Sequence, residues 1–88
     1  MKEKEIEKIL KALANKRRVA IINLLKKRKV VSVGEIAREI KISFNATSKH
    51  LKVLFSADIV EKDQVGLTMF YKISKEIPKF AHHIISIF

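Results

Sequence analysis

The feature that most constrains this 88-residue chain is the stretch over residues 43–60, SFNATSKHLKVLFSADIV. Its apolar and small residues Thr47, Leu51 and Leu54 recur at the i, i+4, i+7 spacing of a single helical stripe. This spacing predicts a helix over about residues 43–57 that packs one face against a core. The rest of the chain must therefore supply that core and leave the other face of the helix accessible.

The opposite face of this helix is predicted to be polar and cationic, because no acidic residue occurs between Ser43 and Ala57. It carries Asn45, Ser48, Lys49 and Lys52. Hydrogen-bond donors and cations are the groups that match base edges and phosphates in the DNA major groove. We expect Asn45, Ser48 and Lys49 to contact bases or the atoms next to them, and Lys52 is a weaker candidate, for a phosphate contact.

A second short helix is predicted immediately before the first. Ser32 and Glu35 have the S-x-x-E spacing of a capping box, ahead of an apolar run. Lys41 and Ile42 form a tight connection to Ser43, the predicted N-cap of the next helix. Two short helices joined in this way, with the second polar on its outer face, form the helix-turn-helix pattern.

The flanking segments complete a predicted mainly α fold with a small β-hairpin, a winged helix-turn-helix in one domain over residues 1–88. Helices are expected over residues 1–14, 16–28 (with Asn15 as N-cap) and 75–88, where Pro78 is tolerated in the first turn. The apolar period changes from 3.6 to 2 after Asp58, which predicts strands over residues 59–63 and 68–73 and a turn over 64–67 that contains Gly66.

The net charge of +10 is concentrated in one part of the chain. Residues 1–52 contain fifteen Lys and Arg against five Asp and Glu, whereas residues 53–88 contain four of each. This asymmetry indicates a polyanionic partner, with general solubility as the alternative. Arg18 is a weaker candidate for a phosphate contact. On the hairpin wing, Lys62 and Gln64 are weaker candidates for contact with the DNA backbone or a minor groove. The tip has no arginine, so a purely structural hairpin is an equal alternative.

The two terminal helices carry more apolar surface than one small domain covers. We therefore expect residues 3–14 and 75–88 to form the interface of a twofold homodimer. A helix lying on a membrane surface is the rival interpretation, which the short segment with few cations disfavours. No apolar run reaches the roughly 20 residues that cross a bilayer, no signal-peptide pattern occurs, and there are no cysteines. A cytoplasmic protein without disulfides is expected.

Three stretches resemble a known family: LANKRRVAIINLL (residues 13–25), SVGEIA (residues 32–37) and SKHLKVL (residues 48–54). They look like the ArsR family of winged-helix transcriptional repressors, and the resemblance covers about residues 6–74. It implies that Arg18 matches the arginine of the family's second helix, and that Ser48 and His50 match the core of its recognition helix. Arg18 is therefore either a phosphate contact or a structural residue.

The chain departs from the family pattern at several positions. Phe44 stands where a polar residue is usual, and it is expected either to contact a thymine methyl group or, preferably, to pack against its own domain. Asn45 and Ala46 replace small hydroxyl residues, so the base sequence that the helix reads stays open. Asp58 replaces the usual glycine and can adopt its left-handed backbone.

The metal-sensing chemistry of many relatives is not expected here. The third helix has no thiol, and His82 and His83 are adjacent residues that point about 100° apart on a helix. Even one histidine from each of two subunits gives fewer ligands than zinc usually takes. No metal or other cofactor is expected. The three histidines and nine acidic residues form no catalytic spacing, so an enzyme is not expected either.

The sequence thus predicts a homodimeric, sequence-specific DNA-binding transcriptional regulator, a repressor, whose helix at about residues 43–57 enters the major groove. Two alternatives stay open. One is a winged-helix module for protein–protein interaction, which would bind little DNA. The other is a non-specific architectural protein, which would bind all duplexes equally.

Overall fold

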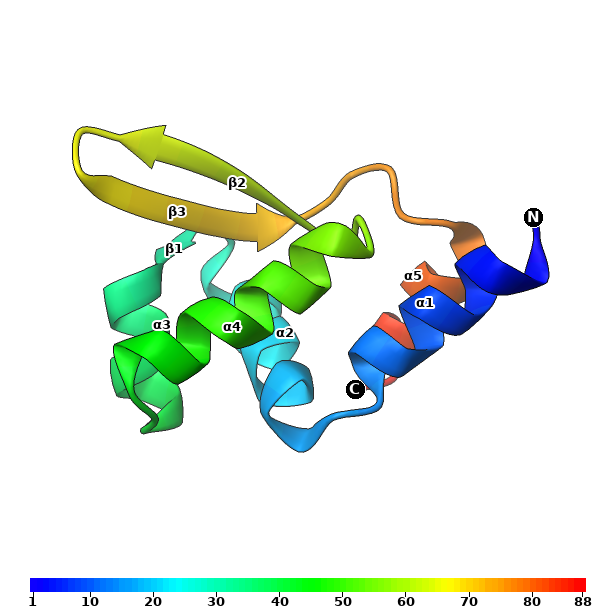
Figure 1. Cartoon of the computed structure of the whole chain (residues 1–88), viewed down its shortest axis with the longest axis horizontal. Helices are drawn as coiled ribbons and strands as arrows, with labels where there is room; N and C mark the ends of the chain where they lie inside the picture. The colour runs from blue at the N-terminus through cyan, green and yellow to red at the C-terminus, as the bar shows by residue number, and fades with distance from the viewer.

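The structure is a computed structural model that describes all of residues 1–88. It contains five helices and three strands: α1 (Glu3–Leu13), α2 (Lys16–Arg28), β1 (Val31–Ser32), α3 (Val33–Ile40), α4 (Phe44–Ser56), β2 (Val60–Val65), β3 (Thr68–Ile73) and α5 (Lys79–Ser86). The tip of the β2–β3 hairpin lies at one end of the 36 Å long axis, and α1 and α5 lie toward the other end, where the N-terminus also lies (Figure 1).

A single apolar core joins these elements. Its most completely buried side chains include Ile21 and Leu25 of α2, Ile36 of α3 and Leu54 of α4, all at most 1% exposed. The same core extends to Ala81 and Ile85 of α5. Burial of this kind contributes roughly 25 cal/mol per Å² of apolar surface removed from water. Because a short helix is marginal by itself, this packing is what holds each element in place.

The three helix starts predicted from capping residues are confirmed. The Asn15 side chain accepts from the backbone N–H groups of Arg17 and Arg18 at 3.0 and 3.1 Å. The Ser32 hydroxyl accepts from the Glu35 N–H at 3.2 Å and donates to the Glu35 carboxylate at 3.1 Å. Within the capping box, this hydrogen bond from Ser32 is the main cause of the lowered pKa of Glu35. Such caps each contribute about 1 kcal/mol.

The sheet has one more strand than the sequence predicted. The predicted hairpin of β2 and β3 is present, but β1 also pairs with β3, in the antiparallel order β1-β3-β2 with Val31 opposite Tyr71. The hairpin loop is shorter than the predicted turn over residues 64–67, because the ladder continues to the pair Val65 and Thr68. Gly66 has φ = 63°, the left-handed region that suits glycine at a two-residue loop. Asp58 likewise has φ = 59°, as predicted.

The last helix begins later than predicted. The prediction of a helix over residues 75–88 is wrong at its start, because α5 begins at Lys79 and Pro78 is its N-cap. Proline disfavours helical backbone at the residue before it, here Ile77. The segment is also held from outside, since the Lys75 N–H donates to the Glu61 carboxylate at 3.0 Å, which is the main cause of the lowered pKa of Glu61.

Candidate nucleic-acid interface

Helix α4 is fixed to the core by the stripe that the sequence predicted. Thr47, Leu51 and Leu54 all have 0% exposure. The Thr47 hydroxyl satisfies its own polarity by donating to the Ser43 carbonyl at 2.8 Å, and the Ser43 hydroxyl accepts from the Ala46 N–H at 3.0 Å. These contacts determine the rotation of the helix about its axis, and so determine which residues face outward.

The outward face presents the residues predicted to contact DNA. Asn45, Lys49 and Lys52 are exposed, and Ser48 is half-buried. No ion pair or internal hydrogen bond occupies the side chains of these four residues. Their donors and charges are therefore free for an external partner, and α4 lies along one side of the molecule where such a partner has access (Figure 1).

The side chain of Phe44, the first residue of α4, is more exposed than predicted. Packing against its own domain is wrong, because the side chain is 59% exposed. A phenylalanine this accessible, beside Asn45 and on the same end of the helix, adds an apolar contact to a polar face. The apolar partner that suits it in a major groove is a thymine methyl group.

Arg18 connects three helices. Its Nε donates to the Ala12 carbonyl at 2.6 Å and one terminal nitrogen donates to the Lys11 carbonyl at 3.1 Å, so the guanidinium closes the C-terminal end of α1. Its other terminal nitrogen lies 3.3 Å from Nδ1 of His50 on α4. The sequence left two roles open for Arg18, a phosphate contact or a structural residue. These hydrogen bonds are those of a structural residue.

The contact between Arg18 and His50 indicates the protonation state of the histidine. An arginine has donors only, so the His50 Nδ1 must be the acceptor and the ring must be neutral. Burial is the main cause that lowers the pKa of His50, and the positive charges of Arg18 and Arg17 lower it further. A neutral His50 thus completes the packing of α4 against α2.

The wing places its two candidate residues differently. The Lys62 ammonium lies 4.3 Å from the centre of the Phe55 ring, a cation–π contact that holds the hairpin to the end of α4. Gln64 lies farther along β2, where its amide donates to the Gly66 carbonyl at 3.2 Å. Both side chains are exposed. Leu67, at the tip, is fully exposed.

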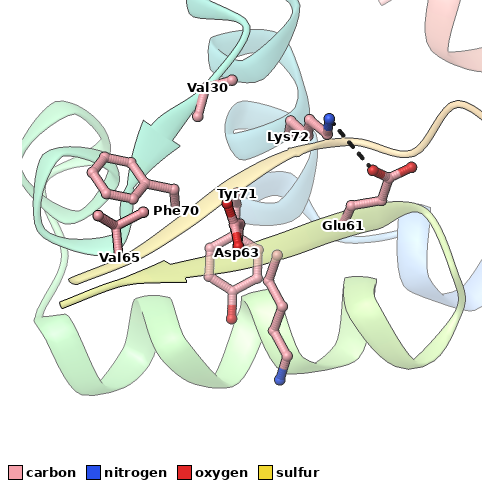
Figure 2. Close-up of a pocket in the computed structure, with 8 residues that line it drawn as sticks. Val30, Glu61, Asp63, Val65, Phe70, Tyr71 and Lys72 are labelled. Atoms are coloured by element: carbon pink, nitrogen blue, oxygen red, sulfur yellow. Dashed lines mark ion pairs between the residues drawn. The ribbon is translucent and has the colours of Figure 1, made fainter. Parts of the chain in front are cut away.

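A hollow of about 530 Å³ lies on the hairpin (Figure 2). Val30, Val65 and Phe70 give it an apolar part, and an ion pair at 3.6 Å between Lys72 and Glu61 closes one end (Figure 2). Tyr71 points from β3 toward α4, and its burial raises the pKa of its hydroxyl (Figure 2). This lining contains no grouping of nucleophile, acid and base that would support catalysis.

The potential metal-ligating side chains are dispersed over this chain. No three His, Cys, Asp or Glu side chains come close enough together to bind an ion. His82 and His83 are both exposed on α5. No helix has the length and apolar content required to cross a membrane.

The terminal helices leave apolar side chains uncovered. On α1, Leu10 is 44% exposed and borders a shallow hollow of about 490 Å³ with Ile6 and Ala14. Just beyond α5, Ile87 is 72% exposed. Both helices lie on the side of the molecule opposite the hairpin tip (Figure 1).

Sequence reasoning missed two cations near α4. Lys8 and Lys11 of α1 line a hollow of about 430 Å³ together with Lys49 and Lys52 of α4. On α1 alone, cations that follow the acidic first turn match the helix dipole and need no ligand to explain them. Their i, i+3 spacing shows that they share a helical face, but which element that face approaches depends on tertiary packing.

Comparison with known proteins agrees with this geometry. The family model described as "Bacterial regulatory protein, arsR family" matches residues 15–62, which include α2, both helices of the helix-turn-helix and the start of the wing. A search of curated protein sequences finds no match.

Several solved structures are similar over nearly the whole chain. HlyU from Vibrio cholerae is 29% identical, with a TM-score of 0.82, over 99% of this chain and 92% of its own. The homodimeric winged helix-turn-helix DNA-binding domain Mb0332 from Mycobacterium bovis is 26% identical, with a TM-score of 0.82, over 96% and 74%. The transcriptional repressor PagR of Bacillus anthracis is 25% identical, with a TM-score of 0.78, over 96% and 92%.

The family match covers more than half of the chain and includes both helices of the helix-turn-helix and the start of the wing. The family and the fold are those of DNA-binding transcriptional regulators and not of enzymes. The chain therefore belongs to the arsR family of winged helix-turn-helix transcriptional regulators.

Proposed function

We propose that the protein is a homodimeric, sequence-specific repressor that inserts α4 into the major groove of a palindromic operator. The observation that carries this proposal is the division of α4 into two faces. One face has 0% exposure at Thr47, Leu51 and Leu54, and the other presents donors and cations with no acid among them. A rigidly held donor face is what direct readout of base edges requires.

The side chains on this face have different roles. Asn45, Ser48 and Lys49 contact bases or the atoms next to them, and Phe44 contacts a thymine methyl group. Lys52 contacts phosphate, which fixes register without carrying sequence information. Lys62 and Gln64 make weaker contacts from the wing. Arg18 acts indirectly, because its hydrogen bonds join α1, α2 and α4.

The dimer forms through the terminal helices. The exposed side chains of Leu10 and Ile87 would be covered if α1 and α5 packed against a second copy, and a twofold axis there would present two α4 helices to one duplex. The homodimeric state of Mb0332 and the repressor activity of PagR support the two parts of the proposal. A regulator of this kind acts beside DNA, in the cytoplasm.

Selection of bound sequences from a random duplex pool tests the proposal. We expect an enriched palindrome whose half-sites lie about one helical turn apart, roughly 10 base pairs. Equal binding of selected and random duplexes at the same salt concentration would instead indicate a non-specific architectural protein. Absence of a gel shift even on random duplex at low salt would indicate a protein-interaction module. Either result would overturn the proposal.

A further inference from the structure

The hollow between α1 and α4 has an unusual charge. Its lining includes Lys8 and Lys11 from α1, Lys49 and Lys52 from α4, and Arg18 from α2. No acidic residue lines it. Five cations around one hollow of about 430 Å³ repel one another, so the free energy of the folded state would fall if an anion neutralised them.

Most of this charge is not compensated within the protein. Lys8, Lys49 and Lys52 form no ion pair. Lys11 has one partner, the Glu7 carboxylate at 3.9 Å, but both side chains are more than 65% exposed, and surface pairs of this kind contribute little. The Arg18 guanidinium faces carbonyl oxygens and His50, which leaves its charge unpaired.

Helix α1 separates this cationic face from its apolar one. At 100° per residue, Lys8 lies about 160° around the helix from Leu10, and the two side chains border different hollows. A second protein copy that covers Leu10 would therefore leave Lys8 open, whereas Lys11 lies about 100° from Leu10 and borders both hollows. Burial and charge thus assign the face that carries Leu10 and the face that carries Lys8 to two different partners.

The occupant is indicated by the residues that the hollow shares with the recognition helix. Lys49 and Lys52 belong to both surfaces, so a duplex that meets α4 also meets this hollow. The hollow is lined by residues of α1, α2 and α4, and α1 and α5 lie at the end of the molecule opposite the hairpin tip (Figure 1). In a dimer joined at that end, the DNA that passes there is the part between the two half-sites.

We propose that α1 is a second DNA-contacting element, whose Lys8 and Lys11 bind the sugar–phosphate backbone at the centre of the operator. This inference rests on the proposed DNA-binding function and extends it to a helix outside the helix-turn-helix. The contacts are to phosphate, so they raise affinity for every duplex and leave base preference unchanged.

The test compares two double variants with the same charge loss. Lys8→Ala with Lys11→Ala removes the α1 cations. Lys27→Ala with Lys75→Ala is the control, because both residues are exposed and neither lines this hollow. For each protein the binding constant is measured against salt concentration, on the selected operator and on a random duplex. Circular dichroism and sedimentation verify helix content and dimerisation.

We expect the α1 variant to reduce the slope of log K against log salt by about 3.6 for a dimer that loses four phosphate contacts. The control should keep the wild-type slope. The ratio of operator to random binding should stay unchanged, and Lys8→Arg with Lys11→Arg should restore the slope. Ethylation of phosphates at the operator centre should weaken the wild-type protein and have no effect on the α1 variant.

An α1 variant with the wild-type slope would overturn the inference while wild-type binding still supported the proposed function. An equal loss in the control would also overturn it, because the effect would then be one of net charge. If the wild-type protein binds no duplex, the proposed function itself fails, and the two failures are thereby distinguished.

Discussion

Helices α4 and α5 are both short and amphipathic, but a single chain buries them to different extents. Helix α4 has a serine N-cap and a stripe of three residues at 0% exposure. Helix α5 has proline as its N-cap with no side-chain hydrogen bond, and Ile87 directly after it is 72% exposed. The comparison teaches that one chain suffices to position the recognition helix, whereas the terminal end leaves apolar side chains exposed, which the proposed dimer would cover.

The way in which α5 is held supports this distinction. The Lys26 ammonium donates to the Ile85 carbonyl at 2.9 Å and so stabilises the C-terminal end of α5 from α2. Only Ala81 and Ile85 of α5 are buried. Phe80 and Ile84 pack against the core but are only partly buried, and contact with a second copy, as proposed, would add apolar burial.

The largest effect is expected where α4 meets the core. Leu51→Ala should lower the free energy of unfolding by about 2–5 kcal/mol, because it opens a cavity under a side chain with no exposure. Val53→Ala, on the same helix but 41% exposed, should change it much less. Urea unfolding monitored by circular dichroism measures both. Equal losses would contradict the assignment of the two faces of α4.

The next largest effect is expected at the terminal end. Leu10→Lys together with Ile87→Lys should weaken dimerisation at least about a hundredfold, since the exposed part of each apolar side chain would contribute a fraction of the roughly 1.5–3 kcal/mol of full burial, and each is lost twice in a symmetric dimer. Sedimentation equilibrium measures this change. Leu67→Lys, at the exposed wing tip, is the control and should leave the dimer intact. A wild-type protein that is monomeric at high concentration would refute the dimer.

A smaller effect is expected on specificity. Asn45→Ala should reduce discrimination between the operator and a site altered at the contacted base pair by about 1–3 kcal/mol. Binding to random duplex should stay within error of the wild type, because an amide carries no charge to release counterions. Competition binding with matched duplexes measures the ratio of the two affinities. If the variant discriminates as well as the wild type, Asn45 does not read that base pair.

The smallest effect is expected from the pH dependence of His50. Because its pKa in the folded protein lies below the ordinary value of 6.5, the stability that it contributes is fully present above about pH 6.5. This contribution is lost as the pH falls through the folded pKa. His50→Gln should therefore show a weaker loss of stability than the wild type between pH 7 and pH 5, measured by urea unfolding. Parallel curves for the two proteins would contradict this role.

Local signals in the sequence were sufficient for most of the fold. The caps at Asn15, Ser32 and Ser43 predicted three helix starts, since a cap needs only residues within one turn of itself. The stripe of Thr47, Leu51 and Leu54 predicted which side of α4 is buried. Family resemblance strengthened the assignment of the helix-turn-helix and wing, and the comparisons confirmed it.

The features that the sequence did not predict depend on distant partners. The pairing of Val31 with Tyr71 joins residues 40 positions apart, and no local pattern encodes it. Phe44 was expected to pack on its own domain, but no neighbour covers it. Lys8 and Lys11 of α1 belong to the cationic hollow only because tertiary packing brings them beside Lys49 and Lys52.

The most direct test of the central claim is the salt dependence of DNA binding by Lys49→Ala. Lys49 is exposed on the outward face of α4, and its removal should not unfold the protein. We predict that the variant binds its operator more weakly and that the slope of log K against log salt falls by about one ion per subunit. A variant that binds with wild-type affinity and slope would contradict the placement of α4 in the groove.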